Sequence, residues 1–156
     1  KYLIKSNKRN NFPFIVLRLY QVYGPNQSVN RLIPIVITSC LKNQKFKCSN
    51  GKQLRDFIYV KDLINLINKI IFVKKKITGI FNVGSGKPVS VKSIIRLINK
   101  RIKKGFPQYG KVKMRKDESD NYYPRLNKIK NSLKWKATTS LNFGLFKTIK
   151  FYNEFI

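Results

Sequence analysis

The sequence has no histidine, two cysteines and only six acidic residues in a chain of 156. Without histidine it has neither the imidazole ligands of most zinc sites nor the base of a serine or cysteine catalytic triad. Cys40 and Cys48 lack the spacing of a metal-binding motif, so we expect two reduced thiols and no bound metal. Six carboxylates are too few to favour a hydrolase that works through a pair of them.

Long apolar runs are also missing. No run reaches the length of about 18 residues that a helix needs to cross a bilayer. The first eleven residues are basic and polar and have no apolar centre of the signal-peptide kind. We therefore predict a cytoplasmic protein with no membrane partner. The chain begins at Lys1 and not at Met, and we expect it to be a piece of a longer protein.

Basic residues are in large excess. With 34 Lys and Arg against six acids the net charge is +28, which suits a polyanion as partner and makes a basic nucleic-acid-binding module one hypothesis. The cations are mostly lysines scattered along the chain, together with many Ile and Asn, as an AT-rich coding bias produces. The aromatic residues sit mainly in apolar stretches. We therefore favour solvated lysine-rich faces and no specific nucleic acid.

The apolar residues alternate between strand-like and helix-like segments. The near-continuous run at 14–20 is typical of a strand buried on both faces, and 61–73 has apolar residues at helical spacing. Ser90 has the place of a helix N-cap. The pattern predicts extended segments at 14–20, 45–48, 57–60, 79–83 and 111–115, and helices at 31–41, 61–73, 90–104, 126–133 and 141–155. Such alternation favours an α/β fold.

Gly84-Ser85-Gly86 follows a predicted strand and precedes a helix. A dinucleotide-binding loop would have a third glycine where this chain has Val89, so an ordinary strand-to-helix turn is the interpretation we favour. Arg55 and Asp56 stand beside an aromatic and β-branched run. Taken alone they predict a structural ion pair more often than a ligand site, although an arginine there can offer its fork of donors to an anion.

Seven segments together resemble one family. In chain order they are Leu17–Pro25, Arg31–Pro34, Gly51–Leu63, Phe81–Gly86, Arg115–Glu118, Leu133–Trp135 and Gly144–Tyr152. Their order and spacing resemble the NAD(P)-dependent sugar-nucleotide epimerases and dehydratases of the extended short-chain dehydrogenase/reductase class. The resemblance covers nearly the whole chain.

The resemblance implies the last strands of a Rossmann-like parallel sheet and the smaller C-terminal α/β lobe that binds substrate. Segments 14–24 and 79–104 would belong to the sheet, and 25–73 and 105–156 to the lobe. The family's glycine-rich cofactor loop and catalytic Tyr-x-x-x-Lys pair lie N-terminal to every matching segment. The resemblance therefore implies no catalytic residue in this chain, and NAD or NADP held mainly by a missing N-terminal half.

The resemblance also assigns site residues. Tyr20 and Gln21 would lie beside the nicotinamide ring. Arg55 would grip a nucleotide diphosphate, oriented by Asp56, and Glu118 would match a residue that holds ribose hydroxyls. The full set of implied substrate contacts is Gln21, Arg31, Leu32, Phe46, Cys48, Arg55, Asn82, Arg115, Glu118 and Tyr122.

The implied full-length protein is an epimerase, dehydratase or 4-ketoreductase of nucleotide-diphosphate sugars, homodimeric and serving cell-surface polysaccharide synthesis. The chain by itself is expected to be inactive, and a catalytically inactive, truncated relative is the alternative. Two departures from the family affect the C-terminal surface. Arg125 replaces an acidic residue, and Leu133-Lys134-Trp135 replaces Leu-Gly-Trp, with Ala137 in place of Pro.

Overall fold

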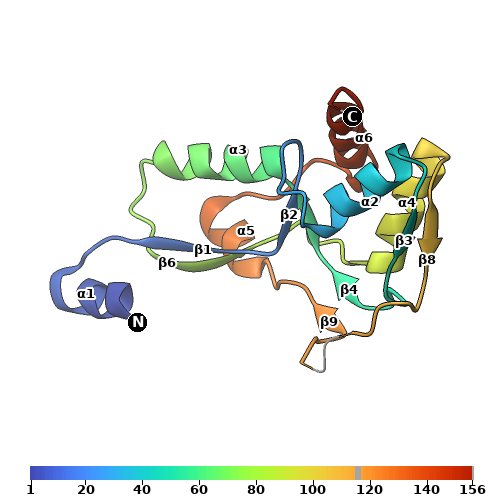
Figure 1. Ribbon diagram of the computed structural model, residues 1–156. Helices are drawn as coiled ribbons and strands as arrows, with labels where there is room; N and C mark the ends of the chain where they lie inside the picture. The colour runs from blue at the N-terminus through green and yellow to red at the C-terminus, as the bar shows by residue number, and fades with distance from the viewer. Residues whose placement is uncertain (115–116, 156) are drawn as a thin grey trace.

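The computed structural model describes residues 1–114 and 117–155. Its helices are α1 (Tyr2–Asn10), α2 (Leu32–Leu41), α3 (Val60–Ile71), α4 (Val91–Ile102), α5 (Asn127–Leu133) and α6 (Leu141–Asn153). Its strands are β1 (Ile15–Leu19), β2 (Gln21–Tyr23), β3 (Lys45–Lys47), β4 (Leu54–Arg55), β5 (Phe57–Tyr59), β6 (Gly79–Val83), β7 (Val89–Ser90), β8 (Phe106–Gln108) and β9 (Asn121–Tyr122). The fold is α/β, as predicted (Figure 1).

Two parallel strand pairs form the sheet portion. In the longer pair, β1 lies beside β6 with Ile15 opposite Gly79 and Leu19 opposite Val83. In the shorter one, β2 lies beside β5. The prediction that the first strand is buried on both faces is wrong, because its residues are half-buried or exposed and Leu19 is 46% exposed. A parallel strand is buried on both faces only between flanking elements, and β6 is the one described strand paired with β1.

Short strands make up the other portion. Strand β3 pairs in parallel with β8, and β4 lies between β7 and β9. The predicted extended segment at 111–115 is not a strand at 111–114, and residue 115 lies outside the described residues. The strand lies earlier, at Phe106–Gln108, between two glycines in the left-handed region, Gly105 (φ 85°) and Gly110 (φ 76°). Such glycines allow sharp turns at both ends of this strand, a signal that alternation alone does not carry.

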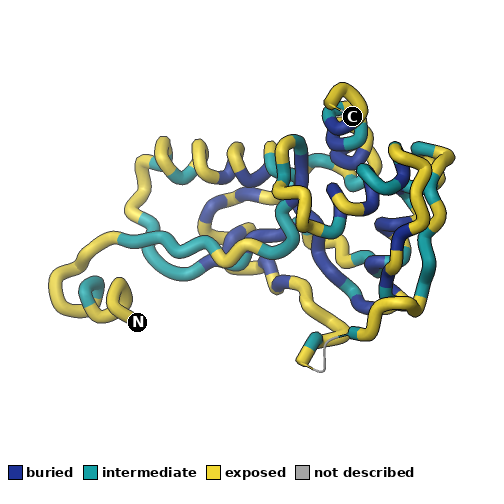
Figure 2. Tube along the Cα trace, viewed as in Figure 1, coloured by how far each residue is buried: buried dark blue, intermediate teal, exposed yellow. Residues whose placement is uncertain are grey.

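Two hydrophobic cores hold these portions together (Figure 2). The first joins α2, α4 and α6 to β3, with Ile37, Ile95 and Ile98 fully buried. The second joins α3 and α5 to β6 around Phe81 and Trp135. The predicted grouping of 79–104 with the sheet and 25–73 with the lobe stays a prediction; in this structure α4 shares the first core with α2, and α3 shares the second with β6.

Side-chain caps fix where two of the helices begin. The Ser90 hydroxyl accepts a hydrogen bond from the Ser93 amide at 3.1 Å, which confirms the predicted N-cap, and Ser140 accepts one from Phe143 at 3.3 Å. Each bond satisfies one amide that has no partner within its helix. The Ser90 cap also sets where β7 ends and α4 begins.

Replacing Ser90 with alanine is expected to lower the free energy of unfolding by about 1 kcal/mol, because the first turn of α4 loses its capping acceptor. Urea denaturation followed by circular dichroism measures the change. Ser93→Ala is the control, since it removes the hydroxyl that lies 2.8 Å from the Ser90 hydroxyl but keeps the capped amide. An equal loss in both variants would contradict the capping role.

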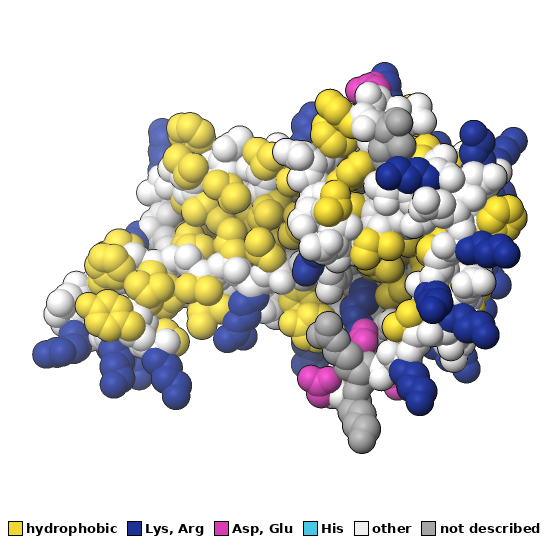
Figure 3. Space-filling view, in the orientation of Figure 1, with side chains coloured by type: hydrophobic (Ala, Val, Ile, Leu, Met, Phe, Trp, Pro, Cys, Tyr) yellow, Lys and Arg dark blue, Asp and Glu magenta, His cyan; other side chains and the backbone are white. Residues whose placement is uncertain are grey.

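The N-terminal helix was not predicted. Helix α1 contains no buried residue, so packing gives no signal for it in the sequence pattern. Near it, Figure 3 shows a broad apolar surface over α1, β1 and α3. Exposed side chains of α3 include Ile64 at 50% and Ile71 at 66%. None of the described helices combines the length and the apolar character needed to cross a membrane.

Candidate functional site

A cavity of about 370 Å³ opens between α2, β3 and β4. Six of the residues predicted to form a site line it, namely Gln21, Leu32, Phe46, Cys48, Arg55 and Glu118. They come from positions 21 to 118 of the chain, so the fold brings together residues that are far apart in sequence. Its apolar wall includes Val36, Phe57 and Ile95. Its charged lining, among the described residues, consists of three cations, Lys47, Arg55 and Lys113, and one carboxylate, Glu118.

A second cavity, of about 490 Å³, lies beside the first at the start of α2. Gln21, Leu32 and Glu118 line both cavities, and Arg31 lines the second. Arg31 precedes α2 in an extended conformation (φ −96°, ψ 153°), and no side chain caps the helix. Pro34 has no N–H, so the Leu32 and Ile33 amides are the first-turn donors that remain for another acceptor, and the helix dipole adds partial positive charge there.

Arg55 is held at the cavity wall by hydrogen bonds. Its Nη2 lies 2.6 Å from Oε1 of Glu118, and its Nη1 donates to the carbonyl of Leu54 at 2.8 Å. The two charged side chains are 9% and 31% exposed, respectively. This is the one ion pair found within 1–114 and 117–155. Nη1 also donates to the Asp120 carbonyl at 3.4 Å. The guanidinium is therefore fixed in orientation, and its Nε and the second hydrogen of Nη2 are the donors left for an anion.

The Asp56 carboxylate makes no ion pair with Arg55, which corrects the predicted structural ion pair between these neighbours. Its carboxylate is fully buried and accepts hydrogen bonds from the amides of Ser85 at 2.6 Å and Gly86 at 2.7 Å. Adjacent residues of an extended chain point to opposite sides, which separates the two side chains. The Gly84-Ser85-Gly86 turn thus already binds an anion, the protein's own carboxylate, which supports the favoured interpretation of it as a turn.

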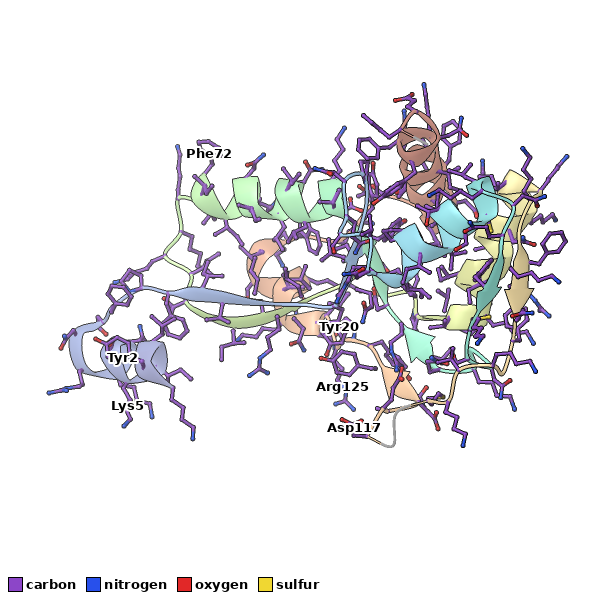
Figure 4. The ribbon with its side chains drawn as sticks, in the orientation of Figure 1. Tyr2, Lys5, Tyr20, Phe72, Asp117 and Arg125 are labelled. Atoms are coloured by element: carbon purple, nitrogen blue, oxygen red, sulfur yellow. The ribbon has the colours of Figure 1, made fainter. Side chains whose placement is uncertain are left out.

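Three further predicted residues, Tyr20, Asn82 and Tyr122, lie near the carboxyl ends of β1 and β6. Tyr20 follows β1 in the middle of the molecule (Figure 4), and its ring stacks on that of Tyr122 at 4.9 Å between centroids. Tyr122 is 51% exposed and lies opposite Arg55 across the β4–β9 pair. Asn82 lies in β6 and is not among the lining residues of either cavity. Arg115 lies outside the described residues.

Residues that sequence reasoning missed also line the main cavity. Gln53 is 5% exposed and donates weakly to Ser49 and Glu118, while its Oε1 is buried and has no hydrogen-bond partner among the described residues. Met114 is the single methionine of the chain and lines the same wall. Gln53 stands two residues before Arg55, and in an extended chain residues two apart face the same side. That spacing was the signal that could have found it.

Two kinds of bound group can be tested against these residues. No cluster of three potential metal ligands occurs among the residues that the structure describes. For a dinucleotide, the Ser85 and Gly86 amides that could cradle a phosphate are already used by Asp56. The sequence has a Tyr-x-x-x-Lys spacing at Tyr109 to Lys113, but this stretch is not helical, so the two side chains do not share a helix face.

Both cysteines are free thiols, as predicted. Burial raises the pKa of Cys40 and of Cys48 above the usual thiol value near 9.0, and the Lys92 ammonium partly opposes this for Cys48. Thiolate is the reactive form. We therefore expect iodoacetamide to modify both thiols more slowly in the folded chain than in urea, with a rate that rises through pH 9. Cys48 is 8% exposed and Cys40 is 0% exposed, so Cys48 should react faster, and Cys48→Ser should remove the faster phase of modification. A rate in the folded chain equal to that in urea would contradict the burial of both thiols.

Comparison with known proteins adds independent evidence. A sequence model described as "NAD dependent epimerase/dehydratase family" matches residues 1–84. CDP-abequose synthase of Salmonella typhimurium is 29% identical over 147 residues, which are 90% of this chain and 49% of that protein. The dTDP-D-glucose 4,6-dehydratase of Mus musculus is 27% identical over 154 residues, which are 94% of this chain and 43% of that protein. The chain thus spans about half the length of these curated relatives.

A solved structure matches over the same extent. UDP-glucuronic acid 4-epimerase of Bacillus cereus, in complex with UDP-glucuronic acid and NAD, superimposes with a TM-score of 0.89 at 25% identity. The match covers 99% of this chain and 49% of that one. Fold and sequence therefore point to the same group of proteins.

Proposed function

The chain belongs to the NAD dependent epimerase/dehydratase family, and from this we propose that its main cavity binds the nucleotide diphosphate of a nucleotide sugar. In this proposal Arg55 holds the diphosphate, Phe46 and Cys48 border the base, and Glu118 accepts from the ribose hydroxyls. Arg31 and Leu32 approach the phosphates from the start of α2. Asn82, Tyr122 and Arg115 remain in the proposed substrate-binding set.

The observation that carries this proposal is the mixture of surfaces in one cavity. Lys47, Arg55 and Lys113 supply positive charge, and the uncapped start of α2 adds amide donors. The apolar wall suits a flat base, and the volume of about 370 Å³ lies in the range of small-molecule sites. A diphosphate is an anion whose charge is spread over several oxygens, so it matches a guanidinium fork beside helix amides.

The cofactor proposal is narrower. NAD or NADP would supply hydride transfer in the complete enzyme, and the residues of this chain proposed to touch its ring are Tyr20 and Gln21. The described residues offer no free glycine-loop cradle for the cofactor phosphates, because Asp56 uses the Ser85 and Gly86 amides. We propose an epimerase, dehydratase or 4-ketoreductase as the whole protein, with its substrate oriented by these residues, active as a homodimer in cell-surface polysaccharide synthesis.

Calorimetric titration of the chain with UDP, CDP and dTDP tests the binding proposal. At least one of them should give a saturable binding heat. Its affinity should fall as the salt concentration rises, because phosphate contacts are electrostatic. Inorganic sulfate at the same ionic strength is the control for charge alone. Equal heats for sulfate and for every nucleotide would contradict a nucleotide site.

NAD-dependent turnover separates the active and inactive alternatives. We expect no conversion of UDP or dTDP sugars, followed by proton NMR of the sugar, when this chain is mixed with them and NAD, because no described residue is assigned as acid or base. Detectable turnover would contradict that assignment. Activity in a longer product of the same gene would favour the enzyme over an inactive relative.

A further inference from the structure

Asp56 is the most completely enclosed carboxylate near the cavity. It is 0% exposed, and each of its oxygens accepts one backbone amide, Oδ1 from Ser85 at 2.6 Å and Oδ2 from Gly86 at 2.7 Å. Buried carboxylates are costly unless their lone pairs are satisfied. Short bonds of this charge-assisted kind are about twice as strong as neutral ones. The turn and the carboxylate are therefore locked to one another.

The turn closes tightly around this carboxylate. A Cβ built on Gly84 would lie 3.0 Å from Cγ of Asp56 and 2.6 Å from Cγ of Pro124. Gly86 has a φ of 76°, a left-handed conformation that suits glycine. Both glycines of the motif thus serve the approach of backbone to Asp56. A side chain at residue 84 would push the amides away from their acceptor.

These bonds close a ring through Arg55. Asp56 fixes the turn at 85–86, the turn leads into β7, and Val89 of β7 pairs with Arg55 of β4. On the other side, the Asp56 carbonyl accepts the Gln21 amide at 3.0 Å. The position of Arg55 is thus set from two directions by its neighbour, although their side chains point apart.

We propose that Asp56 is a positioning residue for ligand binding: its carboxylate anchors the Ser85–Gly86 turn, and the segment held in this way keeps Arg55 at the cavity wall and keeps the Asp56 carbonyl on the Gln21 amide. The inference rests on the proposed nucleotide site. It assigns the second residue of the Arg55-Asp56 pair a role that neither an ion pair nor a direct ligand contact would give it. Without the anchor, the turn and β7 relax and the guanidinium loses its fixed orientation.

A second buried carboxylate provides a matched control. Asp62 is 2% exposed and accepts from the Thr138 amide at 3.2 Å and the Thr139 amide at 3.1 Å. It joins the start of α3 to the segment before α6 and lines neither cavity beside Arg55. Asp56 and Asp62 therefore share burial and bonding to backbone amides, and they differ in what they hold.

The test compares Asp56→Asn with Asp62→Asn in the 156-residue chain, using hydrogen exchange without ligand and calorimetry with UDP. Both variants should lower the melting temperature. In Asp56→Asn alone, the Ser85, Gly86 and Gln21 amides should exchange at least about tenfold faster and UDP should bind about tenfold more weakly, since one charge-assisted bond is lost. Asp62→Asn should keep UDP affinity within about twofold, because Asp62 lines neither cavity and holds a different segment.

Equal losses of UDP affinity in the two variants would overturn the positioning role and leave Asp56 as a fold residue. Unchanged exchange of the Ser85 and Gly86 amides in Asp56→Asn would overturn it as well. If the wild-type chain binds no UDP, the nucleotide site is wrong, while the exchange of Gln21 still decides whether Asp56 fixes the cavity wall. Asp56→Ala is a second variant that keeps the proposal testable if Asp56→Asn does not fold. Sodium formate, which supplies a free carboxylate, should restore protection of the Ser85 and Gly86 amides in this variant, whereas sodium chloride should not. Equal effects of both salts would contradict the anchoring role of the Asp56 carboxylate.

Discussion

Replacing Arg55 with alanine is expected to weaken the binding of UDP or a related nucleoside diphosphate by about 2 kcal/mol or more. The guanidinium is the most enclosed cation of the cavity, and Glu118 and the Leu54 carbonyl already fix its orientation. A ligand phosphate therefore meets a preorganised donor and orders little else on binding. The variant also leaves the Glu118 carboxylate unpaired beside the incoming anion, which adds repulsion. Isothermal calorimetry measures the change.

Arg101→Ala is the matched control for this result. Arg101 lies in the last turn of α4, and its guanidinium is 5.5 Å from the centre of the Phe146 ring, outside the main cavity. The substitution removes the same charge from the chain but lies outside the main cavity, so it should change the free energy of UDP binding by about 0.5 kcal/mol or less. Equal effects of the two substitutions would show that net charge, and not the Arg55 site, governs binding.

Phe81→Ala is expected to lower the free energy of unfolding by about 3–5 kcal/mol, the usual cost of truncating a buried phenylalanine. Phe81 is 1% exposed at the centre of the second core, between β1, α3 and α5. The Lys128 ammonium lies 4.8 Å from the centre of its ring and cannot fill the space that the ring leaves. Urea denaturation followed by Trp135 fluorescence reports on the same core.

Phe72→Ala provides the comparison for the core substitution. Phe72 follows α3 and is 80% exposed, so its removal should change stability by about 0.5 kcal/mol or less. A small effect of Phe81→Ala, similar to that of Phe72→Ala, would contradict a packed second core around β6.

Much of the fold could be predicted because helices and buried strands leave regular patterns. Ser90 and the apolar positions of α4 predicted that helix within two residues at its end, and 79–83 was predicted as β6. The two- and three-residue strands were harder to predict. Strand β8 depends on the turns at Gly105 and Gly110, and β9 depends on pairing with β4. Long-range pairing of so few residues leaves no periodicity to detect.

Six of the ten substrate contacts implied by the resemblance line one cavity, but the contacts that hold these residues in place could not be predicted. Gln21, Arg55 and Glu118 came from the resemblance, and the fold brings them to one cavity. The partners of Asp56 were missed, because adjacent charges suggest a pair while the extended backbone turns them to opposite sides. Ser85 and Gly86 are about thirty residues away in sequence, so only the tertiary structure could identify them.

The single methionine offers the most direct test of the central proposal, that a nucleoside diphosphate binds in the main cavity. Met114 lines that cavity, whereas Trp135 lies in the second core. In chain labelled with ¹³C-methyl methionine and ¹⁵N-tryptophan, UDP should shift the Met114 methyl signal saturably and leave the Trp135 indole signal in place. Arg55→Ala should abolish that shift at the same UDP concentration. The proposed site would be contradicted if the Met114 signal did not move at a UDP concentration that saturates the calorimetric titration. A shift confined to Trp135 would contradict it as well.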